Sequence, residues 1–582
     1  MNQLWAETVV RALVAAGVRH VVMAPGSRSA PLALATADAA AGGRLQAHLH
    51  QDERVAAFVG LGIARYTGKP VALVCTSGTA GTHFHAAAAE ARASGIPLVL
   101  ITADRPPDLR HAHAHQTIDQ RGLYGPSVLL WRDLGLPRAE TSALRHLQAT
   151  VAQAVAATLG VPRGPIHLNV PLGDWLHPGP DPAHHPDLLA RLAADLPPVP
   201  RYGPTRLMPE AEALEAATAL VREARRPLVV LGSLGAPWDG EAGPLEEAGF
   251  IVLRDPAAHA AGTGVRGGHL EVMVRAAAQL GLEPDLVIRA GAGPVSGTTL
   301  RWLAGLTVPV IQLQPDLERW DADGRATLVL PGTAGNLLAQ LAVAREAKSE
   351  SPSPWQAAWE RLRTTAVNHA ATAVLPPEPD AVRLALAHWP EHGQVVVGNS
   401  MPIRYVDFVG TNRVRILANR GAAGIDGQVA TALGVRLAAD APTLLVTGDV
   451  AFLHDLGAWA AATAAGAPMA VLLLDNDGGG IFHTLPIGDH PAALTPWCTS
   501  PHGLDPSAAL EAFGVVVHHP RDDAGLRHAL DEALGDDRPH VLRIACERDS
   551  GMTAWQHVLS QGAARAAEAV RSWTRDREEL AQ

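Results

Sequence analysis

The chain has 582 residues, of which 47% are hydrophobic and 18% charged, a composition of folded globular proteins that excludes a disordered chain. Its formal net charge of −11 argues against a nucleic-acid partner, and apolar runs such as 97–103 and 469–474 fall far short of the ~20 residues of a membrane span. Its three cysteines are widely separated and form no CxxC pair, so we expect a cytoplasmic protein with no disulfide framework, zinc site or membrane partner.

Short runs rich in Val, Ile and Leu alternate with alanine-rich segments, the pattern of parallel sheets wrapped by helices. In a first region we predict strands near 19–24, 70–75 and 97–102. After the proline-rich stretch 195–204, a second region carries predicted strands at 227–232, 250–255, 285–290, 309–314 and 326–331. Charged and proline-rich sequence around 345–379 marks the next boundary, and predicted strands follow at 394–399, 415–419, 443–449, 470–476 and 540–545, before a helical tail at about 552–582.

These regions predict an α/β protein with three parallel-sheet, Rossmann-like domains. A chain of this length is too long for a single hydrophobic core. We place an N-terminal domain at 1–190, a central α/β domain at 200–350, a third domain at 375–550 and a C-terminal helical tail at 551–582.

The segment LDNDGGGIF at 474–482 ends an apolar run in three consecutive glycines, which weaken regular structure. The preceding predicted strand ends at Asp449, and a helix near 455–465 would complete one β-α-β unit. Asp449 and Asn476 would then stand at the carboxyl edge of one sheet, where their oxygens suit Mg²⁺ and free glycine N–H groups and a following helix N-terminus would face phosphate oxygens. A tight turn beside an unrelated Gly-Asp loop explains the two segments equally well at this point.

The spacing of these residues resembles the diphosphate motif of thiamine-diphosphate enzymes. In that family an Asp, an Asn and a main-chain carbonyl two residues beyond the Asn hold a divalent metal. The resemblance implies that Asp449, Asn476 and the carbonyl of Gly478 bind Mg²⁺ or Mn²⁺ and, with it, thiamine diphosphate. Val450 stands where the motif usually has a glycine, a departure that some branches tolerate. The third domain would be the diphosphate-binding domain, with the glycines as a cradle.

Thiamine-diphosphate enzymes also place a carboxylate beside the aminopyrimidine ring, which favours the imino tautomer that can remove the thiazolium C2 proton. In LHQDERVAAFVGLGIAR at 49–65, Glu53 occupies the matching place, which makes the first domain the pyrimidine-binding domain and Glu53 the catalytic residue. Taken alone, Glu53 is more typical of a solvated acid at a helix start. The two motifs together favour catalysis, and because the family builds its site between subunits, a homodimer or homotetramer is implied.

Six segments narrow the resemblance to one family, the 2-succinyl-5-enolpyruvyl-6-hydroxy-3-cyclohexene-1-carboxylate synthases of menaquinone biosynthesis. They are PGSRSAPL (25–32), HQDER (50–54), TSGTA (76–80), TADRPPDL (102–109), GNSMPIR (398–404) and NRGAAGIDG (419–427). The resemblance implies decarboxylation of 2-oxoglutarate and addition of the succinyl carbanion to isochorismate, with release of CO₂. It covers the first and third regions and is weak in the middle.

Two alternatives to this family fit the sequence less well. Another thiamine-diphosphate enzyme, a 2-oxo-acid decarboxylase or an acetohydroxyacid-type synthase, would not need so many arginines that bind carboxylates. A non-catalytic α/β regulatory protein would not need Glu53, Asp449 and Asn476 together.

Both substrates of the family are dianions, and the planar fork of arginine suits carboxylates. By resemblance, the isochorismate carboxylates would be bound by Ser27, Arg28, Arg105 and Gln116. The succinyl side would be held by Ser400, Arg404 and Arg420, with Ile425 beneath the cofactor, keeping it bent. The family's middle-domain lysine is absent from 290–302, where Arg301 is the one Lys or Arg, and we leave this contact out of the predicted site.

Overall fold

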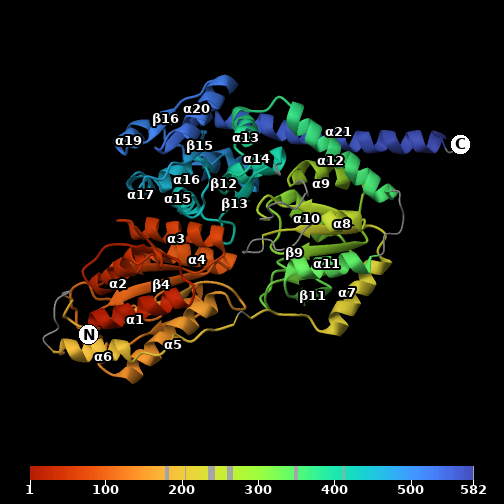
Figure 1. The fold of residues 1–582 in the computed structure, drawn as a ribbon. Helices are drawn as coiled ribbons and strands as arrows, with labels where there is room; N and C mark the ends of the chain where they lie inside the picture. Colours follow the sequence, from red (N-terminus) through yellow and green to blue (C-terminus); the bar gives the residue numbers. More distant parts are fainter. Residues whose placement is uncertain are drawn as a thin grey trace. The chain divides into compact units, whose positions relative to one another are not determined.

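The computed structural model of the chain describes residues 1–176, 183–203, 205–233, 243–258, 267–345, 352–410 and 413–580 (Figure 1). Three sheets form, and all of their strand pairs are parallel, which confirms the predicted α/β class. The chain divides into two compact units. The first comprises Met1–Thr205, Asn419–Asp440 and His454–Ala467, and the second comprises Arg206–Ala418, Ala441–Leu453 and Pro468–Gln582.

The first unit contains a six-stranded sheet with the order β2-β1-β3-β4-β6-β5. Its strands are β1 (His20–Met23), β2 (Gln46–Leu49), β3 (Val71–Cys75), β4 (Leu98–Asp104), β5 (Trp131–Asp133) and β6 (Ile166–Pro171). Apolar side chains of this sheet share a core with three helices, α1 (Asn2–Ala15), α2 (Ala30–Ala41) and α5 (Thr141–Thr158). Strands β3 and β4 are buried along their whole length, as the interior of a parallel sheet requires.

Helix α3 (Glu53–Thr67) contacts β1 and β3 and packs closely against α15 (Gln428–Ala438) in the same unit. Glycines permit this approach, because a Cβ on Gly62 would collide with the carbonyl oxygen of Thr431 and a Cβ on Gly434 with that of Val59. The helix that carries Glu53 in its first turn is therefore held tightly. The same unit contains α4 (His85–Ser94), α6 (Pro186–Ala194) and α17 (Ala458–Ala464).

The second unit contains two sheets. The five-stranded sheet has the order β11-β10-β9-β7-β8, and its strands are β7 (Pro227–Leu231), β8 (Ile251–Arg254), β9 (Leu286–Ala290), β10 (Val310–Gln314) and β11 (Leu328–Pro331). Its flanking helices are α7 (Ala211–Glu223), α8 (Gly243–Glu247), α9 (Leu270–Leu280), α10 (Gly297–Gly305) and α11 (Ala334–Ala344). Apolar side chains of α7 and α11 form one core with this sheet.

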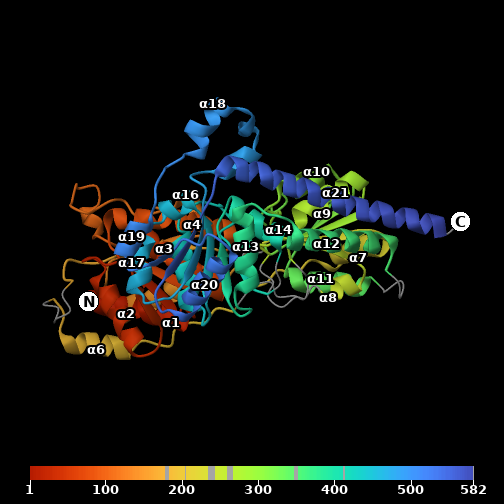
Figure 2. The same cartoon turned by 90° about the horizontal axis from the view of Figure 1, so that it is seen from above.

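The six-stranded sheet of the second unit has the order β13-β12-β14-β15-β17-β16. Its strands are β12 (Gln394–Val397), β13 (Arg415–Leu417), β14 (Thr443–Gly448), β15 (Ala470–Asp475), β16 (Val516–His518) and β17 (His540–Ala545). The helices of this part are α12 (Pro354–Thr372), α13 (Pro377–His388), α14 (Met401–Val409), α16 (Asp449–His454), α18 (Pro491–Ala493), α19 (Ser507–Ala512), α20 (Asp523–Gly535) and α21 (Arg548–Leu580). The long helix α21 runs beside α12 and α9 (Figures 1 and 2).

Each strand predicted from an apolar run is present within a few residues of its expected position. The stretch around 345–379 is mostly helical, because it contains α12 and the start of α13; residues 346–351 lie outside the described part. The helix expected near 455–465 is α17, and the separate short helix α16 ends before it at His454. The predicted domain boundaries stay predictions. Across the described ranges, no helix has both the length and the apolar character needed to cross a bilayer.

Candidate active site

Strands β14 and β15 are parallel neighbours, with Gly448 opposite Leu474. This register brings Asp449 to the same sheet edge as the residues that follow β15. The Asp449 carboxylate accepts hydrogen bonds from the N–H of Gly478 at 2.8 Å and from that of Val450 at 2.7 Å. The structure therefore brings two of the three predicted metal-binding residues, Asp449 and Gly478, into direct contact.

Asn476 follows β15 at the same sheet edge, and within the described part of the chain its amide oxygen has no hydrogen-bond partner. The residue is 6% exposed, its Nδ2 donates to Oε1 of Glu378 at 3.0 Å, and no described residue bonds to its Oδ1. Leaving a buried polar atom unsatisfied costs ~1–3 kcal/mol. Burial also raises the pKa of Asp449, because the buried carboxylate has lost the water that would stabilise its negative charge. A bound cation would supply that stabilisation. A carboxylate, an amide oxygen and a main-chain carbonyl form a hard oxygen donor set, which fits Mg²⁺ or Mn²⁺.

Two more side chains stand at this edge that the sequence did not single out. Single donor atoms of Asp449, Asp475 and His502 lie within 4.8 Å of one another. His502 Nε2 is 3.2 Å from Asp449 Oδ2, while Asp475 Oδ2 accepts from Arg543 Nε at 2.6 Å. His502 lies in an irregular segment 53 residues from Asp449, so no sequence spacing indicates their contact.

The three consecutive glycines form a tight turn, and their N–H groups bond to acceptors within the protein. The expectation that these N–H groups are free to bind phosphate is therefore wrong. Gly478 N–H donates to Asp449, Gly479 N–H to the Thr499 carbonyl at 2.6 Å, and Gly480 N–H to the Gly478 carbonyl at 3.1 Å. Gly478 has φ 133°, and a Cβ there would collide with the Thr499 carbonyl oxygen. The expected following helix is a five-residue 3₁₀ turn, Gly480–Thr484, too short for an anion site. The Gly478 carbonyl keeps a second lone pair for a metal.

In the first unit, Glu53 begins helix α3 directly after its cap. The Asp52 carboxylate accepts from the N–H groups of Arg54 at 2.8 Å and Val55 at 3.2 Å, which fixes the start of the helix. Glu53 is half-buried. Burial, together with the negative charge of Glu53, raises the pKa of the Cys75 thiol at the end of β3. The Glu53 carboxylate therefore lies near the carboxyl end of a central strand.

The predicted isochorismate residues all lie in the first unit. Arg28 is buried and donates through Nη1 to the carbonyls of Leu172 at 3.1 Å and Gly173 at 2.9 Å. Burial and the nearby positive charge of Arg105 lower the pKa of Arg28. Asp174, whose Oδ1 is 3.8 Å from Arg28 Nη2, and Asp104 offset part of this repulsion, and a carboxylate ligand would offset more of it. Ser27, next to Arg28, is exposed.

Gln116 is joined to Arg105 and to the TSGTA segment. Arg105 Nη2 donates to the carbonyl of His115 at 3.1 Å. Ser77 Oγ donates to the Gln116 carbonyl, and Gln116 Nε2 donates to the Ser77 carbonyl, each at 3.1 Å. Gln116 has φ 56°, a conformation that these two bonds hold in place. The structure thus brings Arg28, Arg105 and Gln116 into one region of the unit.

The residues predicted for the succinyl side divide between the two units. Ser400 and Arg404 lie in the second unit, where the Ser400 carbonyl accepts from Arg404 Nη1 at 2.5 Å. Arg404 also lines a cavity of about 180 Å³ together with Arg301, the cation noted in the middle region.

Arg420 and Ile425 belong to the first unit, and Arg420 is half-buried. Ile425 is 40% exposed, so it is not a core residue of its unit. The loop between them is anchored by Glu90, whose carboxylate accepts from three consecutive backbone N–H groups, residues 421–423. Sequence analysis missed Glu90, which lies in an alanine-rich helix without any motif.

Comparison with known proteins places both site-bearing regions in one enzyme class. Residues 5–123 match the family "Thiamine pyrophosphate enzyme, N-terminal TPP binding domain", and residues 397–544 match "Thiamine pyrophosphate enzyme, C-terminal TPP binding domain". The first range contains Glu53, and the second contains Asp449, Asn476 and Gly478. The protein is therefore a thiamine-diphosphate-dependent enzyme.

Three relatives match along nearly their whole length and share one name, 2-succinyl-5-enolpyruvyl-6-hydroxy-3-cyclohexene-1-carboxylate synthase. The protein of Myxococcus xanthus is 35% identical over 97% of this chain and 98% of its own. That of Haloarcula marismortui is 36% identical over 94% and 95%, and that of Rubrobacter xylanophilus is 37% identical over 97% and 98%. The chain described here belongs to the family of 2-succinyl-5-enolpyruvyl-6-hydroxy-3-cyclohexene-1-carboxylate synthases.

Proposed function

We propose that this protein decarboxylates 2-oxoglutarate and adds the resulting succinyl unit to isochorismate. The products are 2-succinyl-5-enolpyruvyl-6-hydroxy-3-cyclohexene-1-carboxylate and CO₂, in menaquinone biosynthesis. The observation that carries the proposal is the buried Oδ1 of Asn476, to which no described group bonds, at the sheet edge that also carries Asp449, in a chain whose full-length relatives carry the name of this synthase.

Asp449, Asn476 and the Gly478 carbonyl would hold Mg²⁺ or Mn²⁺, and through it the diphosphate of the cofactor. When bound, thiamine diphosphate supplies the electron sink that a 2-oxo acid needs in order to lose CO₂. Glu53 would bind the aminopyrimidine ring and hold a proton there. Ile425 offers an exposed apolar side chain against which the cofactor would rest.

Positive side chains of this chain would bind the two dianionic substrates. Arg28 and Arg105 stand close enough for the charge of one to lower the pKa of the other, and an isochorismate carboxylate would relieve that repulsion. Ser27 and Gln116 would complete this part of the site. Ser400, Arg404 and Arg420 are the residues we assign to the succinyl carboxylate.

We also propose that the protein works as a homodimer or homotetramer in the cytoplasm. The family resemblance supports an oligomer, because its members build each site from two subunits. The three cysteines are unpaired, which fits a reducing compartment.

The proposal is tested by incubating the full chain with thiamine diphosphate and Mg²⁺, and following CO₂ and product by mass spectrometry. With 2-oxoglutarate and isochorismate together we expect a product that combines both carbon skeletons. Pyruvate in place of 2-oxoglutarate serves as the control. Preference for pyruvate, or CO₂ release from 2-oxoglutarate that isochorismate neither accelerates nor diverts to the adduct, would instead indicate a decarboxylase or an acetohydroxyacid-type synthase.

A further inference from the structure

Glu378 stands behind the predicted metal-binding residues and has no counterpart in the motifs discussed above. It lies in the first turn of α13, is 4% exposed, and both of its carboxylate oxygens are hydrogen-bonded. Oε1 accepts from Nδ2 of Asn476 at 3.0 Å, and Oε2 accepts from the hydroxyl of Tyr405 at 2.8 Å. Glu378, Tyr405 and Asn476 come from three different elements of the second unit, so the contact is made by the tertiary fold alone.

The contact with Glu378 decides which way the Asn476 amide points. An amide has a donor end and an acceptor end, and an acceptor oxygen beside one end selects the NH₂ group for that side. With Nδ2 held on Glu378, Oδ1 is turned to the opposite side, where no described side chain or backbone group bonds to it. Without Glu378, a rotation of 180° about the terminal torsion of Asn476 would present NH₂ in place of oxygen. An NH₂ group repels a cation.

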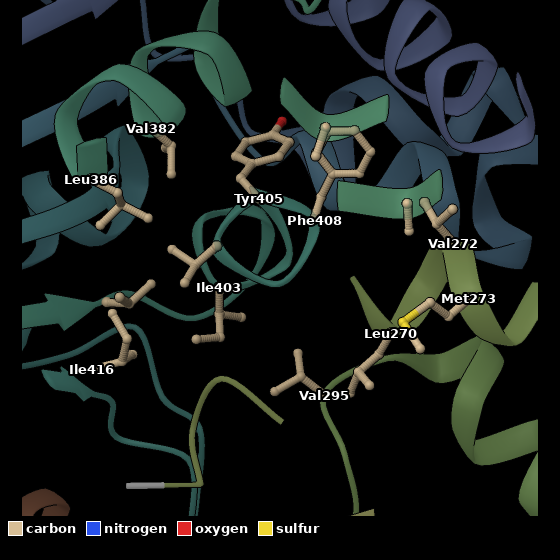
Figure 3. Close-up of a cluster of buried hydrophobic side chains, with 14 of the residues drawn as sticks. Leu270, Val272, Met273, Val295, Val382, Leu386, Ile403, Tyr405, Phe408 and Ile416 are labelled. Atoms are coloured by element: carbon tan, nitrogen blue, oxygen red, sulfur yellow. The ribbon is translucent and has the colours of Figure 1, made fainter. Parts of the chain in front are cut away.

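Glu378 is itself held in place by a rigid partner. The Tyr405 ring packs edge-on against Trp555, with centroids 5.0 Å apart and an interplanar angle of 89°. It belongs to the apolar cluster that also contains Phe408 and Val382 (Figure 3). Because the ring is fully buried in this cluster, its hydroxyl is a fixed donor to Glu378.

We propose that Glu378, supported by Tyr405, is a positioning residue that orients the Asn476 amide oxygen toward the divalent metal of the cofactor. This inference rests on the proposed metal-binding role of Asn476. Side chains that orient metal ligands commonly affect metal affinity by ~10–100-fold, although they never touch the ion. Glu378 therefore acts on metal affinity and not on the reacting atoms.

The test measures metal binding directly, by electron paramagnetic resonance of free Mn²⁺ during titration of the full chain with thiamine diphosphate present. We expect E378M, which removes both acceptors at similar volume, to weaken Mn²⁺ binding by ~10–100-fold. E378Q keeps an acceptor for Asn476 and should lose less affinity than E378M. V382A truncates a buried apolar side chain on the same helix that offers no acceptor to Asn476, so it is the matched control and should bind Mn²⁺ within about threefold of wild type.

The variant Y405F keeps the aromatic ring and its packing and removes only the hydroxyl that bonds to Glu378, so it tests the same contacts even if E378M does not fold. We expect Y405F to lose less Mn²⁺ affinity than E378M and more than V382A. Mn²⁺ affinities of E378M and Y405F equal to that of V382A would overturn the positioning role while leaving the proposed function intact. Absence of Mn²⁺ binding by the wild-type chain would instead overturn the metal site itself, and the inference with it.

Discussion

Replacing Glu90 with alanine removes the acceptor on which a predicted substrate loop is anchored. Glu90 is 3% exposed and accepts from Arg65 Nη2 at 2.8 Å and from Ser94 Oγ at 2.6 Å. The same carboxylate accepts from the N–H groups of Gly421 at 3.0 Å and Ala422 at 2.7 Å. All of these residues belong to the first unit.

The loss of stability in E90A depends on the buried groups that lose their acceptor. Arg65 is buried, and burial already lowers its pKa against the opposing influence of Glu90. Removing one partner of a buried ion pair costs ~3–5 kcal/mol, because the remaining charge stays desolvated. Each loop N–H that stays buried without an acceptor adds ~1–3 kcal/mol. We therefore expect E90A to lower the free energy of unfolding by at least ~3 kcal/mol.

The assay is equilibrium urea unfolding of the full chain without cofactor, followed by far-ultraviolet circular dichroism. Wild type, R65A, E90A and the double variant form a cycle whose coupling energy isolates the pair, and contacting residues of this kind couple by ~0.5–3 kcal/mol. E391A removes an exposed partner of Arg413 and should cost less than ~1 kcal/mol. A loss for E90A no larger than that for E391A, or a coupling energy of zero, would refute the reasoning.

Three further predictions concern catalysis, packing and pH. The variant E53Q should retain binding of thiamine diphosphate and Mg²⁺ by calorimetry while losing most turnover; normal decarboxylation of 2-oxoglutarate would rule out Glu53 as the catalytic residue. G434A should destabilise the chain by ~1–3 kcal/mol in urea unfolding, because its Cβ would strike the Val59 carbonyl, whereas G305A, in open space, should not. Burial raises the pKa of Asp455 to about 7. The stabilising effect of the protonated Asp455 carboxyl is therefore complete below the unfolded pKa of ~3.9 and is lost as pH rises toward 7. The melting temperature of wild type minus that of D455N should fall between pH 4 and pH 8, and a constant difference would contradict this.

The strands that sequence analysis found differ from two that it missed in the polarity of their side chains. Central strands such as β3 and β14 are continuous apolar runs, because both faces of an interior parallel strand are covered. The missed strand β2, QAHL, lies at a sheet edge and is mostly exposed, so it has no apolar run to reveal it. The missed strand β6 is fully buried but carries His167 and Asn169, whose Nε2 and Oδ1 are hydrogen-bonded to the Thr102 hydroxyl of β4 at 2.8 Å and 3.0 Å. Because these two side chains are polar, β6 does not appear in the sequence as an apolar run.

The residues of the candidate site also divide into those that sequence analysis identified and those that it missed. Asp449, Asn476 and Glu53 were identified because each follows or precedes a recognisable element within a motif, and a β-α-β unit carries such residues to a sheet edge. Glu378 and Glu90 contact the site segments across 98 and 331 residues, respectively, and nothing local distinguishes them from solvated helix acids.

The sequence by itself determined the fold class and the residues that stand at strand ends, because these depend on short-range periodicity, and its resemblance to a known family indicated the cofactor. Only the tertiary structure decided which way the Asn476 amide faces, what anchors the loop at 421–423 and how the glycine N–H groups are used. Those outcomes depend on buried partners brought from distant elements, and a polar group removed from water takes whichever partner the packing supplies.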